Sequence, residues 1–394
     1  MSRKFFVNII CVFLLPIYLV GQNITVIGIG RLGLCMALVF EKAGYHVLGV
    51  DMSPQYIDQV NQKTFFSSEP LVTDYLRSSQ NFRATTSLQE GLEFSDLCFI
   101  VVPTNGERGV NNYNFDILSQ VFSRMNVLRI KDKNIVISST VSPGYIRNVG
   151  QPLLDQCENV TISYNPEFIA QGNIIRGLES PDIVLIGEGS EKSGDLLESI
   201  YQTACLNTPY VGRMSCDSAE IAKLALNCFV TAKIAFANLV SDIADSTPNA
   251  NKDVILQCIG TDQRIGHKCL KAGYGFGGPC FPRDNRALAD YADSIGIEPT
   301  LFRATDRTND MHAETQAKQF LQMNLDAYKF EDVCYKSGCP VPIIEASQKL
   351  VVAQKVAQQN KEVTISDRPE VIAQVKKEYG DVFHYEEVSP ILTH

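Results

Sequence analysis

The sequence has little of what a metal site, a disulfide framework or a nucleic-acid binder requires. Only 5 of its 394 residues are histidines, so no histidine-based metal site is expected. Its 12 cysteines run from Cys11 to Cys339 without a CxxC pair, a pattern typical of reduced intracellular thiols rather than of disulfides or zinc ligands. The net charge is -9 with no long basic run, which argues against a nucleic-acid partner. An anionic ligand would need a local basic site.

Residues 23–394 divide into three expected units of an α/β fold, in keeping with the 45% hydrophobic and 20% charged residues. In 23–215, apolar runs alternate with helical stretches, which predicts an N-terminal Rossmann-type, doubly wound parallel sheet. In 216–322, a long helix of about 40 Å could bridge domains and offer a dimerisation face. Residues 323–394 suffice only for an abbreviated C-terminal α/β nucleotide-binding domain.

The pattern also places the individual elements. The first unit is expected to hold strands at 24–28, 46–51, 96–103, 134–141, 161–164 and 182–187. The central unit is expected to hold helices at 218–245, 252–259 and 285–294. The last unit is expected to hold strands at 328–335 and 362–366 and helices at 343–359 and 370–378.

Residues 1–22 form a segment of their own. A Ser-Arg-Lys start precedes an apolar stretch at 5–21, the order found in a secretory signal. The stretch is short for a membrane span, and its Leu-Val-Gly end is a poor cleavage site. A leader or anchor and a mis-assigned start codon therefore both stay open, and membrane contact is expected only if the segment is retained.

A glycine motif, Gly28-Ile29-Gly30-Arg31-Leu32-Gly33, follows the first expected strand and opens a helix. Its glycines permit a tight turn, close approach of a pyrophosphate and close packing of helix on strand, and the helix N-terminus faces the phosphates. The second strand ends at Asp51, 18 residues after Gly33, where a carboxylate can accept from ribose hydroxyls. Because this acid would repel a 2′-phosphate, NAD is expected rather than NADP. The alternative is a glycine turn beside a surface aspartate.

A second glycine-rich loop, 273–278, leads to Cys280 and Asp284. The glycines allow close approach of a substrate, and a helix expected to start at Pro282 would place the thiol near a positive helix end, which favours the thiolate. Cys280 is therefore a candidate nucleophile. The alternative is that it is one more small buried hydrophobic side chain.

Lys223 and Asn227 lie four residues apart on the expected long helix and so project from one face. A cation and an amide together could hold an oxyanion and a water, whereas the alternative is a solvated surface pair. The segments at 139–144 and 165–168 each follow a strand. Ligands bind at strand ends in open α/β sheets, although either segment could be an ordinary turn.

In this order, the segments resemble the UDP-glucose/GDP-mannose dehydrogenase family over roughly residues 23–310, most specifically in the cysteine loop. The matching segments are Gly28-Ile-Gly-Arg-Leu-Gly33, Val102-Pro-Thr104, Ser139-Thr-Val141, Asn165-Pro-Glu-Phe168, Ala219-Glu-Ile-Ala-Lys223 with Asn227, Asp262-Gln-Arg-Ile-Gly266 and Gly275-Phe-Gly-Gly-Pro-Cys-Phe-Pro-Arg-Asp284. The resemblance implies a four-electron, NAD-dependent oxidation of the C6 alcohol of a nucleotide sugar, with UDP-glucose as the expected substrate, through a Cys280 thiohemiacetal and thioester.

The resemblance also implies roles for individual residues. Lys223 would stabilise the oxyanion, Asn227 and Asp284 would position water and substrate, Thr140 would hold a water, and Glu167 would be the acid/base. Arg264 is similar to an arginine that reaches the nucleotide diphosphate of a neighbouring subunit, which implies a homodimer or larger homo-oligomer. The residues placed at the cofactor are Gly28, Ile29, Gly30, Arg31, Leu32, Gly33, Asp51, Pro103, Thr104 and Thr140, and those at the substrate are Glu167, Phe168, Ile169, Lys223, Asn227, Arg264, Tyr274, Gly275, Phe276, Gly277 and Lys336.

Three departures from the family pattern leave alternatives open. Gln171 replaces a second acid, and Tyr56 stands where a basic residue often follows the ribose acid. After Lys336, the segment at 339–343 replaces an acidic-arginine segment. The alternatives are another substrate, such as GDP-mannose or an N-acetylated UDP-sugar, and a non-catalytic NAD-binding scaffold protein. The need for NAD favours a cytoplasmic location.

Overall fold

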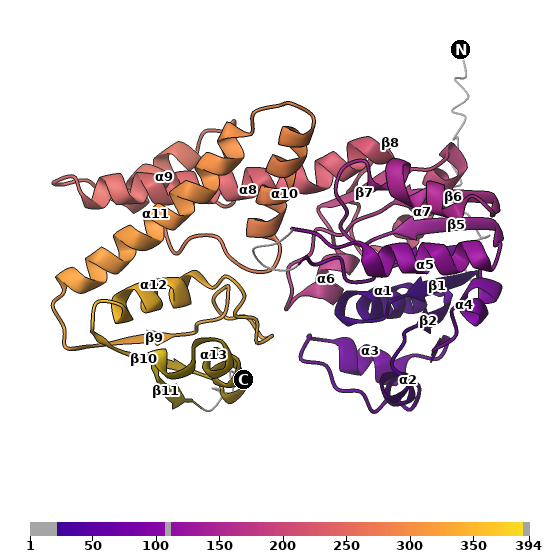
Figure 1. The fold of residues 1–394 in the computed structure, drawn as a ribbon, viewed down its shortest axis with the longest axis horizontal. Coiled ribbons are helices and arrows are strands. Elements are labelled where there is room, and N and C mark those ends of the chain that lie inside the picture. Colours follow the sequence, from indigo (N-terminus) through magenta and orange to yellow (C-terminus); the bar gives the residue numbers. More distant parts are fainter. Residues whose placement is uncertain (1–21, 107–111, 389–394) are drawn as a thin grey trace, which may run out of the picture.

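The computed structural model describes residues 22–106 and 112–388 (Figure 1). The apolar stretch at 5–21, for which a leader or anchor and a mis-assigned start codon both stayed open, lies outside the described residues. Eight strands form the large sheet, in the order β3-β2-β1-β4-β5-β6-β7-β8. The strands are β1 (Asn23–Ile27), β2 (His46–Val50), β3 (Phe82–Thr85), β4 (Leu97–Ile100), β5 (Lys131–Ile137), β6 (Glu158–Tyr164), β7 (Ile183–Glu188) and β8 (Tyr210–Ser215). The helices between them are α1 (Arg31–Lys42), α2 (Pro54–Asn61), α3 (Val72–Ser78), α4 (Leu88–Phe94), α5 (Asp116–Val127), α6 (Ile174–Glu179) and α7 (Glu191–Ala204).

The prediction of a doubly wound, predominantly parallel sheet is confirmed, with one local difference. Strands β6 and β7 meet in antiparallel orientation, through Tyr164 and Gly187, while every other neighbouring pair is parallel. A parallel crossover must carry the chain back along the strand. Six-residue α6 spans only about 9 Å, whereas seven-residue β6 spans about 23 Å. The chain therefore enters β7 at the edge where β6 ends.

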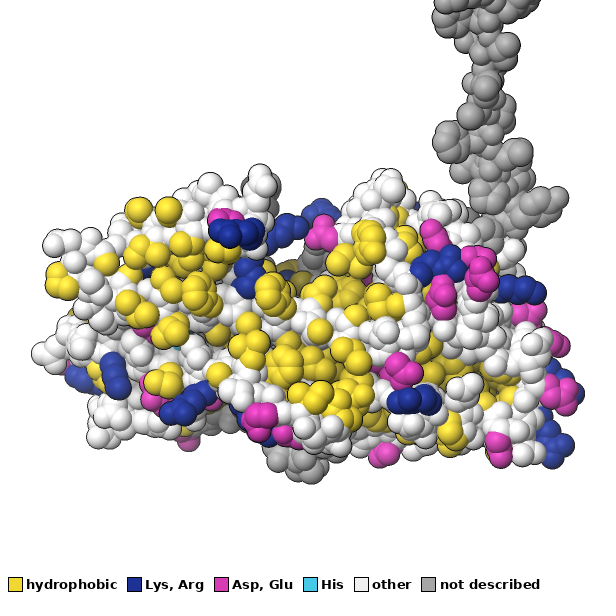
Figure 2. Space-filling model, turned by 90° about the horizontal axis from the view of Figure 1, so that it is seen from above, with side chains coloured by type: hydrophobic (Ala, Val, Ile, Leu, Met, Phe, Trp, Pro, Cys, Tyr) yellow, Lys and Arg dark blue, Asp and Glu magenta, His cyan; other side chains and the backbone are white. Residues whose placement is uncertain are grey.

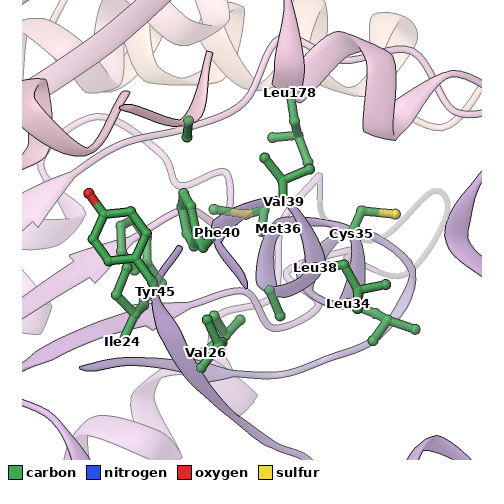
Figure 3. Close-up of a cluster of buried hydrophobic side chains, with 14 of the residues drawn as sticks. Ile24, Val26, Leu34, Cys35, Met36, Leu38, Val39, Phe40, Tyr45 and Leu178 are labelled. Atoms are coloured by element: carbon green, nitrogen blue, oxygen red, sulfur yellow. The ribbon is translucent and has the colours of Figure 1, made fainter. Parts of the chain in front are cut away.

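All six expected strands are present, and two edge strands, β3 and β8, were not expected. The expected strands belong to a core formed by apolar residues of neighbouring elements. In one buried cluster, Leu38 and Phe40 of α1 pack with Ile24 and Val26 of β1 (Figure 3). Strands β3 and β8 contribute few fully buried residues, with Ala84 the main one. A short edge strand carries a weak apolar signal, which is why the sequence pattern does not reveal these two.

A layer of helices follows the large sheet (Figure 1). It consists of α8 (Cys216–Asp245), α9 (Lys252–Gly260), α10 (Phe281–Ser294) and α11 (Thr300–Gln322). The long helix expected at 218–245 is thus confirmed, beginning two residues earlier because Ser215 caps it by accepting from the Ser218 amide. Glu220, fully buried, fastens α8 to the segment that follows β5 by accepting from the amides of Gly144 and Ile146.

By length and composition alone, helix α8 is long and apolar enough to cross a membrane, with a mean hydropathy of 1.5 over its most apolar part. Length and composition alone are weak criteria, because core helices of globular proteins meet them too. In this fold α8 packs against α10 and α11 and carries buried Lys223, Asn227 and Asn238. We therefore interpret it as a core helix.

The C-terminal segment forms a three-stranded parallel sheet, in the order β11-β10-β9, with its own apolar core. Its elements are β9 (Ala327–Glu331), α12 (Gln348–Ala357), β10 (Glu362–Asp367), α13 (Pro369–Tyr379) and β11 (His384–Glu387). The helix expected from residue 343 begins only at Gln348, because Ser347 caps it through the Leu350 amide. Strand β11 was not expected, since the polar sequence His-Tyr-Glu-Glu gives no apolar signal.

Candidate active site

In the turn between β1 and α1, two of the three glycines allow close backbone packing and the third faces open space. Gly28 has φ +90°, and a Cβ there would lie 2.4 Å from the Val101 carbonyl oxygen. A Cβ on Gly33 would lie 1.9 Å from the carbonyl oxygen of Gly28, so α1 reaches β1 only with glycine at this position. At Gly30 a Cβ would meet no protein atom within 4 Å. The backbone there faces open space at a helix N-terminus, which fits a pyrophosphate.

The other residues predicted to bind the cofactor follow neighbouring strands. Strand β1 lies between β2, which leads to Asp51, and β4, which leads to Pro103 and Thr104. The Thr104 hydroxyl donates to the Thr140 carbonyl oxygen at 2.8 Å and so ties the ends of β4 and β5 together. The structure therefore gathers these residues at the topological switch point, where nucleotides bind in such folds.

Two of the residues that depart from the family pattern contact this turn. The Tyr56 hydroxyl donates to the Ile29 carbonyl oxygen at 2.6 Å, and burial raises the pKa of Tyr56, so it remains a donor. Arg31 donates to the side-chain oxygen of Gln171. Both residues thus support the glycine turn.

The open face at Gly30 and the closed one at Gly33 predict different results for alanine substitution. Gly30→Ala should unfold at the temperature of the wild type yet bind NAD at least ten-fold more weakly, because its methyl group enters the ligand space. Gly33→Ala should itself lower the melting temperature, because a Cβ cannot fit 1.9 Å from a backbone oxygen. Thermal unfolding with and without NAD measures both effects. Wild-type NAD affinity in Gly30→Ala would contradict this placement.

The candidate catalytic residues meet where α8 passes α10. Lys223 is 6% exposed; its ammonium donates to the Glu167 carbonyl oxygen and lies 4.5 Å from the centre of the Phe168 ring. Asn227, one turn further along α8, donates to Asp284 Oδ2 at 2.7 Å. Lys223 and Asn227 are therefore not a solvated surface pair. Burial lowers the pKa of Lys223, and the negative charge of Asp284, the largest opposing influence, counteracts this.

Cys280 is the residue that directly precedes α10, where its side chain makes no capping hydrogen bond, and it is an exposed residue. The expected position at a helix start is thus confirmed, but the expectation that this position favours the thiolate left out stronger influences on the thiol. Desolvation by the surrounding protein raises the pKa of the thiol, and the carboxylate of Asp284 raises it further. Arg283 and Lys223 act in the opposite direction. All eleven cysteines within residues 22–106 and 112–388 are free thiols.

Glu167 follows β6 and has the environment of an acid/base. Burial raises its pKa to about 7, although Tyr201 and Lys223 act to lower it. The Tyr201 hydroxyl lies 2.9 Å from Glu167 Oε1. Glu167, Phe168 and Ile169 line a cavity of about 340 Å³ together with Gly177 of α6 and Leu226 of α8. A carboxyl group with a pKa near neutrality beside a cavity suits proton transfer to or from a bound molecule.

The glycine-rich loop before Cys280 is clamped by buried side chains and by the C-terminal segment. Asn309 of α11 pairs with both the amide and the carbonyl of Phe276, at 2.8 and 3.1 Å. A Cβ on Gly277 would lie 2.2 Å from the Ala346 carbonyl oxygen, and the Gly278 amide donates to the Glu345 carbonyl oxygen at 3.0 Å. The segment between β9 and α12 therefore forms one wall of the loop.

Two predicted substrate residues lie at the margin of this arrangement. Lys336 stands 5.7 Å from the centre of the Tyr335 ring, and that ring packs on Gly278. Arg264 is exposed and pairs with Asp262; among residues 22–106 and 112–388, it forms no hydrogen bond or ion pair with the other candidate site residues. In the part of the chain that the structure describes, no three His, Cys, Asp or Glu side chains gather to hold a metal ion.

Comparison with known proteins gives these residues a family. The model of the UDP-glucose/GDP-mannose dehydrogenase family, NAD binding domain, matches residues 22–205, and that of the central domain matches residues 217–311. The chain belongs to the UDP-glucose/GDP-mannose dehydrogenase family. As a member of this family it is an NAD-dependent oxidoreductase that acts on a nucleotide sugar.

Relatives of both substrate classes resemble this chain. The GDP-mannose 6-dehydrogenase of Pseudomonas syringae pv. syringae is 28% identical over 84% of this chain and 78% of its own. The UDP-glucose 6-dehydrogenase of Rickettsia conorii is 32% identical over 73% of this chain and 66% of its own. A solved UDP-glucose dehydrogenase from Pyrobaculum islandicum shares the fold, with a TM-score of 0.84 and 24% identity over 95% of this chain and 88% of that one. Family membership therefore leaves the sugar undetermined.

Four site residues are not revealed by sequence reasoning: Asn105, Tyr113, Tyr201 and Arg283. The Tyr113 hydroxyl donates to Asp284 Oδ1 at 2.6 Å, and Arg283 donates to the Asn105 side chain and lies 3.9 Å from Cys280 Sγ. Three of them could have been found from the sequence. Arg283 directly precedes Asp284, and Asn105 and Tyr113 belong to a segment that follows a strand end. Tyr201 lies on a distant helix, α7, and carries no such signal.

Proposed function

We propose that this chain oxidises the C6 alcohol of a nucleotide sugar to a carboxylate in two successive oxidations, the second of which takes place on a covalent adduct with Cys280. The observation that supports this most is the meeting of Lys223 and Asn227 of α8 with Asp284 of α10, one turn from the thiol. A binding scaffold would have no use for an accessible thiol beside a buried ammonium. We assign NAD binding to residues 23–215, the catalytic loop and self-association to 216–322, and part of the nucleotide contacts to 323–394.

In the first oxidation, Glu167 accepts the proton of the C6 hydroxyl, because its pKa of about 7 leaves much of it ionised near neutrality. NAD, when bound at the glycine turn, accepts the hydride that leaves C6 in each oxidation. The Cys280 sulfur, having lost its proton, then attacks the aldehyde carbon and forms a C–S bond. Lys223 stabilises the resulting oxyanion, which gains a proton to give the thiohemiacetal.

In the second oxidation, the thiohemiacetal loses its hydroxyl proton and the C6 hydride and becomes a thioester. Asp284, Asn227 and Thr140 position a water molecule that adds to the thioester carbon. The C–S bond breaks, the thiolate of Cys280 leaves, and the sugar acid is released. Covalent attachment keeps the aldehyde from escaping between the two oxidations.

UDP-glucose is the substrate that we propose first, with GDP-mannose and N-acetylated UDP-sugars as the alternatives. The experiment offers each nucleotide sugar separately to the full chain with excess NAD and measures NADH formed per sugar consumed. We expect two NADH per sugar with one of them, and that result would name the substrate. One NADH per sugar would contradict the second oxidation at Cys280. No NADH from any of them, with NAD binding intact, would favour the scaffold interpretation.

We further propose that the chain forms a homodimer or larger homo-oligomer through α8 and operates in the cytoplasm, where NAD is available. A band of hydrophobic side chains crosses the face shown in Figure 2. Helix α8 itself exposes Ile221, Phe229, Phe236, Leu239 and Ile243. Contiguous apolar surface of this kind is typical of an interface. Arg264 is exposed and could therefore contact a nucleotide bound to a neighbouring subunit. Light scattering, which gives the mass in solution, would contradict the proposal if the protein proved monomeric.

A further inference from the structure

Arg283 is held in one orientation beside the thiol. Its side chain is only 15% exposed, and its guanidinium carbon stands 4.8 Å from the centre of the Tyr113 ring. One end of the guanidinium donates to the side-chain oxygen of Asn105. The other end, Nη2, lies 3.9 Å from Cys280 Sγ. A planar guanidinium stacked on a ring and anchored at one end presents its other end in a fixed direction.

The partners of Asp284 leave this end of Arg283 free for the sulfur. Tyr113 donates to Asp284 Oδ1 at 2.6 Å and Asn227 donates to Oδ2 at 2.7 Å. The Nε atom of Arg283 stays 3.5 Å from the same carboxylate, which is long for a charge-assisted hydrogen bond. The short hydrogen bonds of Asp284 thus come from Tyr113 and Asn227, and its long ion pair with Arg283 uses only the Nε atom, so Nη2 stays available to the sulfur.

We propose that Arg283 is a further catalytic residue, the fixed cation that stabilises the thiolate of Cys280. This inference rests on the proposed role of Cys280 as the nucleophile. It assigns to Arg283 a task distinct from that of Lys223, whose ammonium is bound to the Glu167 carbonyl oxygen and is needed at the oxyanion.

The charges around Cys280 make such a cation necessary. Asp284 of α10 and Glu345 of the segment before α12 both disfavour a second negative charge at the sulfur. Lys223 of α8 and Arg283 favour it. Burial lowers the pKa of Lys223, so its charge can be lost as pH rises, whereas a guanidinium keeps its charge in proteins. Tyr335, whose ring packs on Gly278, stays neutral because burial raises its pKa.

The position of Arg283 also connects the thiol to the cofactor site. Asn105 directly follows Pro103 and Thr104, and it forms an isolated backbone bridge with Tyr113. Both groups that orient the guanidinium therefore come from the loop after β4, at whose start the proposed cofactor contacts lie. The loop after β4 therefore orients the Arg283 guanidinium beside the sulfur and also carries the proposed cofactor contacts.

The test is the pH dependence of alkylation of Cys280 by iodoacetamide in the full-length protein without NAD or sugar. Mass spectrometry of the peptide that carries Cys280 separates it from every other thiol, including Cys258 and Cys269, which are the other exposed cysteines among the described residues. The midpoint of the rate profile is read, because a raised thiol pKa also makes the thiolate intrinsically more reactive and partly masks the rate at a single pH. In Arg283→Gln the midpoint should rise by about one pH unit.

Two variants serve as references. Arg283→Lys keeps the charge and should stay close to the wild-type midpoint. Arg286→Gln removes the same charge from an exposed position three residues further along α10 and should leave the midpoint unchanged. An unshifted midpoint in Arg283→Gln would overturn the proposal, and so would an equal shift in Arg286→Gln, since that would be a general charge effect.

A fourth variant covers the case in which Arg283→Gln does not fold. Asn105→Ala alters an exposed side chain and removes only the anchor of the guanidinium. Its midpoint should move upward by less than that of Arg283→Gln, and no movement would overturn the proposal. Failure here is distinguishable from failure of the proposed function. Two NADH per sugar with an unshifted midpoint would reject only the role of Arg283, whereas acid formation by a Cys280 variant would reject the thioester mechanism whatever the midpoint.

Discussion

Replacing Cys280 by alanine is expected to abolish formation of the sugar acid and to leave at most one NADH per sugar consumed. The thiol is the only group proposed to bind the aldehyde covalently, and without it no thiohemiacetal forms and no second hydride can leave. NAD binding should persist, because the glycine turn at Gly28–Gly33 does not include this residue. Chromatographic separation of aldehyde and acid, together with NADH absorbance, measures both results.

A matched control for this variant is available within the chain. Cys258 and Cys269 are also exposed thiols, and their alanine variants should retain two NADH per sugar. Cys280→Ser adds a second test, since a serine hydroxyl has the position but not the nucleophilicity of the thiolate. Acid formation at the wild-type rate in Cys280→Ala would exclude the thioester mechanism.

The sequence predicts those parts of the site that are encoded over short distances. The turn at Gly28–Gly33 is specified by its own glycines, since two of them have no room for a Cβ. Lys223 and Asn227 share a helix face because they are four residues apart. The switch-point arrangement of Asp51 and Thr104 also follows, because carboxyl ends of parallel strands meet at one edge of a sheet. Each of these inferences needs only a local pattern and the fold class.

Contacts between distant segments are where sequence reasoning stops. Tyr113 reaches Asp284 across 171 positions of the chain, and no periodicity or spacing relates them. The prediction for the Cys280 thiol is incomplete for the same reason. It included the effect of the helix N-terminus on the thiol pKa but not desolvation and the charge of Asp284, which both raise this pKa. The antiparallel orientation of β7 against β6 follows from the short length of α6. This length is known only once both ends of α6 are known, and helix ends are hard to predict from sequence.

The C-terminal segment shows a second kind of gap. Its departure from the family pattern after Lys336 left open which nucleotide sugar is bound and whether the chain is a non-catalytic scaffold. In the fold, Gly172 and Pro340 are in close contact, since a Cβ on Gly172 would lie 2.8 Å from the proline ring. Arg368, just before α13, donates to the carbonyl oxygens of Cys339 and Pro340 at 2.8 and 3.0 Å. The replaced segment is thus fastened in place beside both the cysteine loop and the large-sheet unit.

Lys223→Ala should lower kcat by about 10²–10³-fold while changing KM only a few-fold, because the ammonium is most needed where negative charge develops on the oxyanion.

The pH dependence of kcat in the wild type supplies a second measurement of the role of Lys223. Burial lowers the pKa of Lys223, so kcat should fall as pH rises through a value below that of an ordinary lysine. Lys223→Arg should move this alkaline limb upward, because a guanidinium stays charged. Lys252→Ala, which removes an amine paired with Asp245, is the control and should match the wild type. Equal losses in kcat and in substrate affinity in Lys223→Ala would show that the ammonium binds the ground state, and a retained alkaline limb in Lys223→Arg would assign that limb to another group.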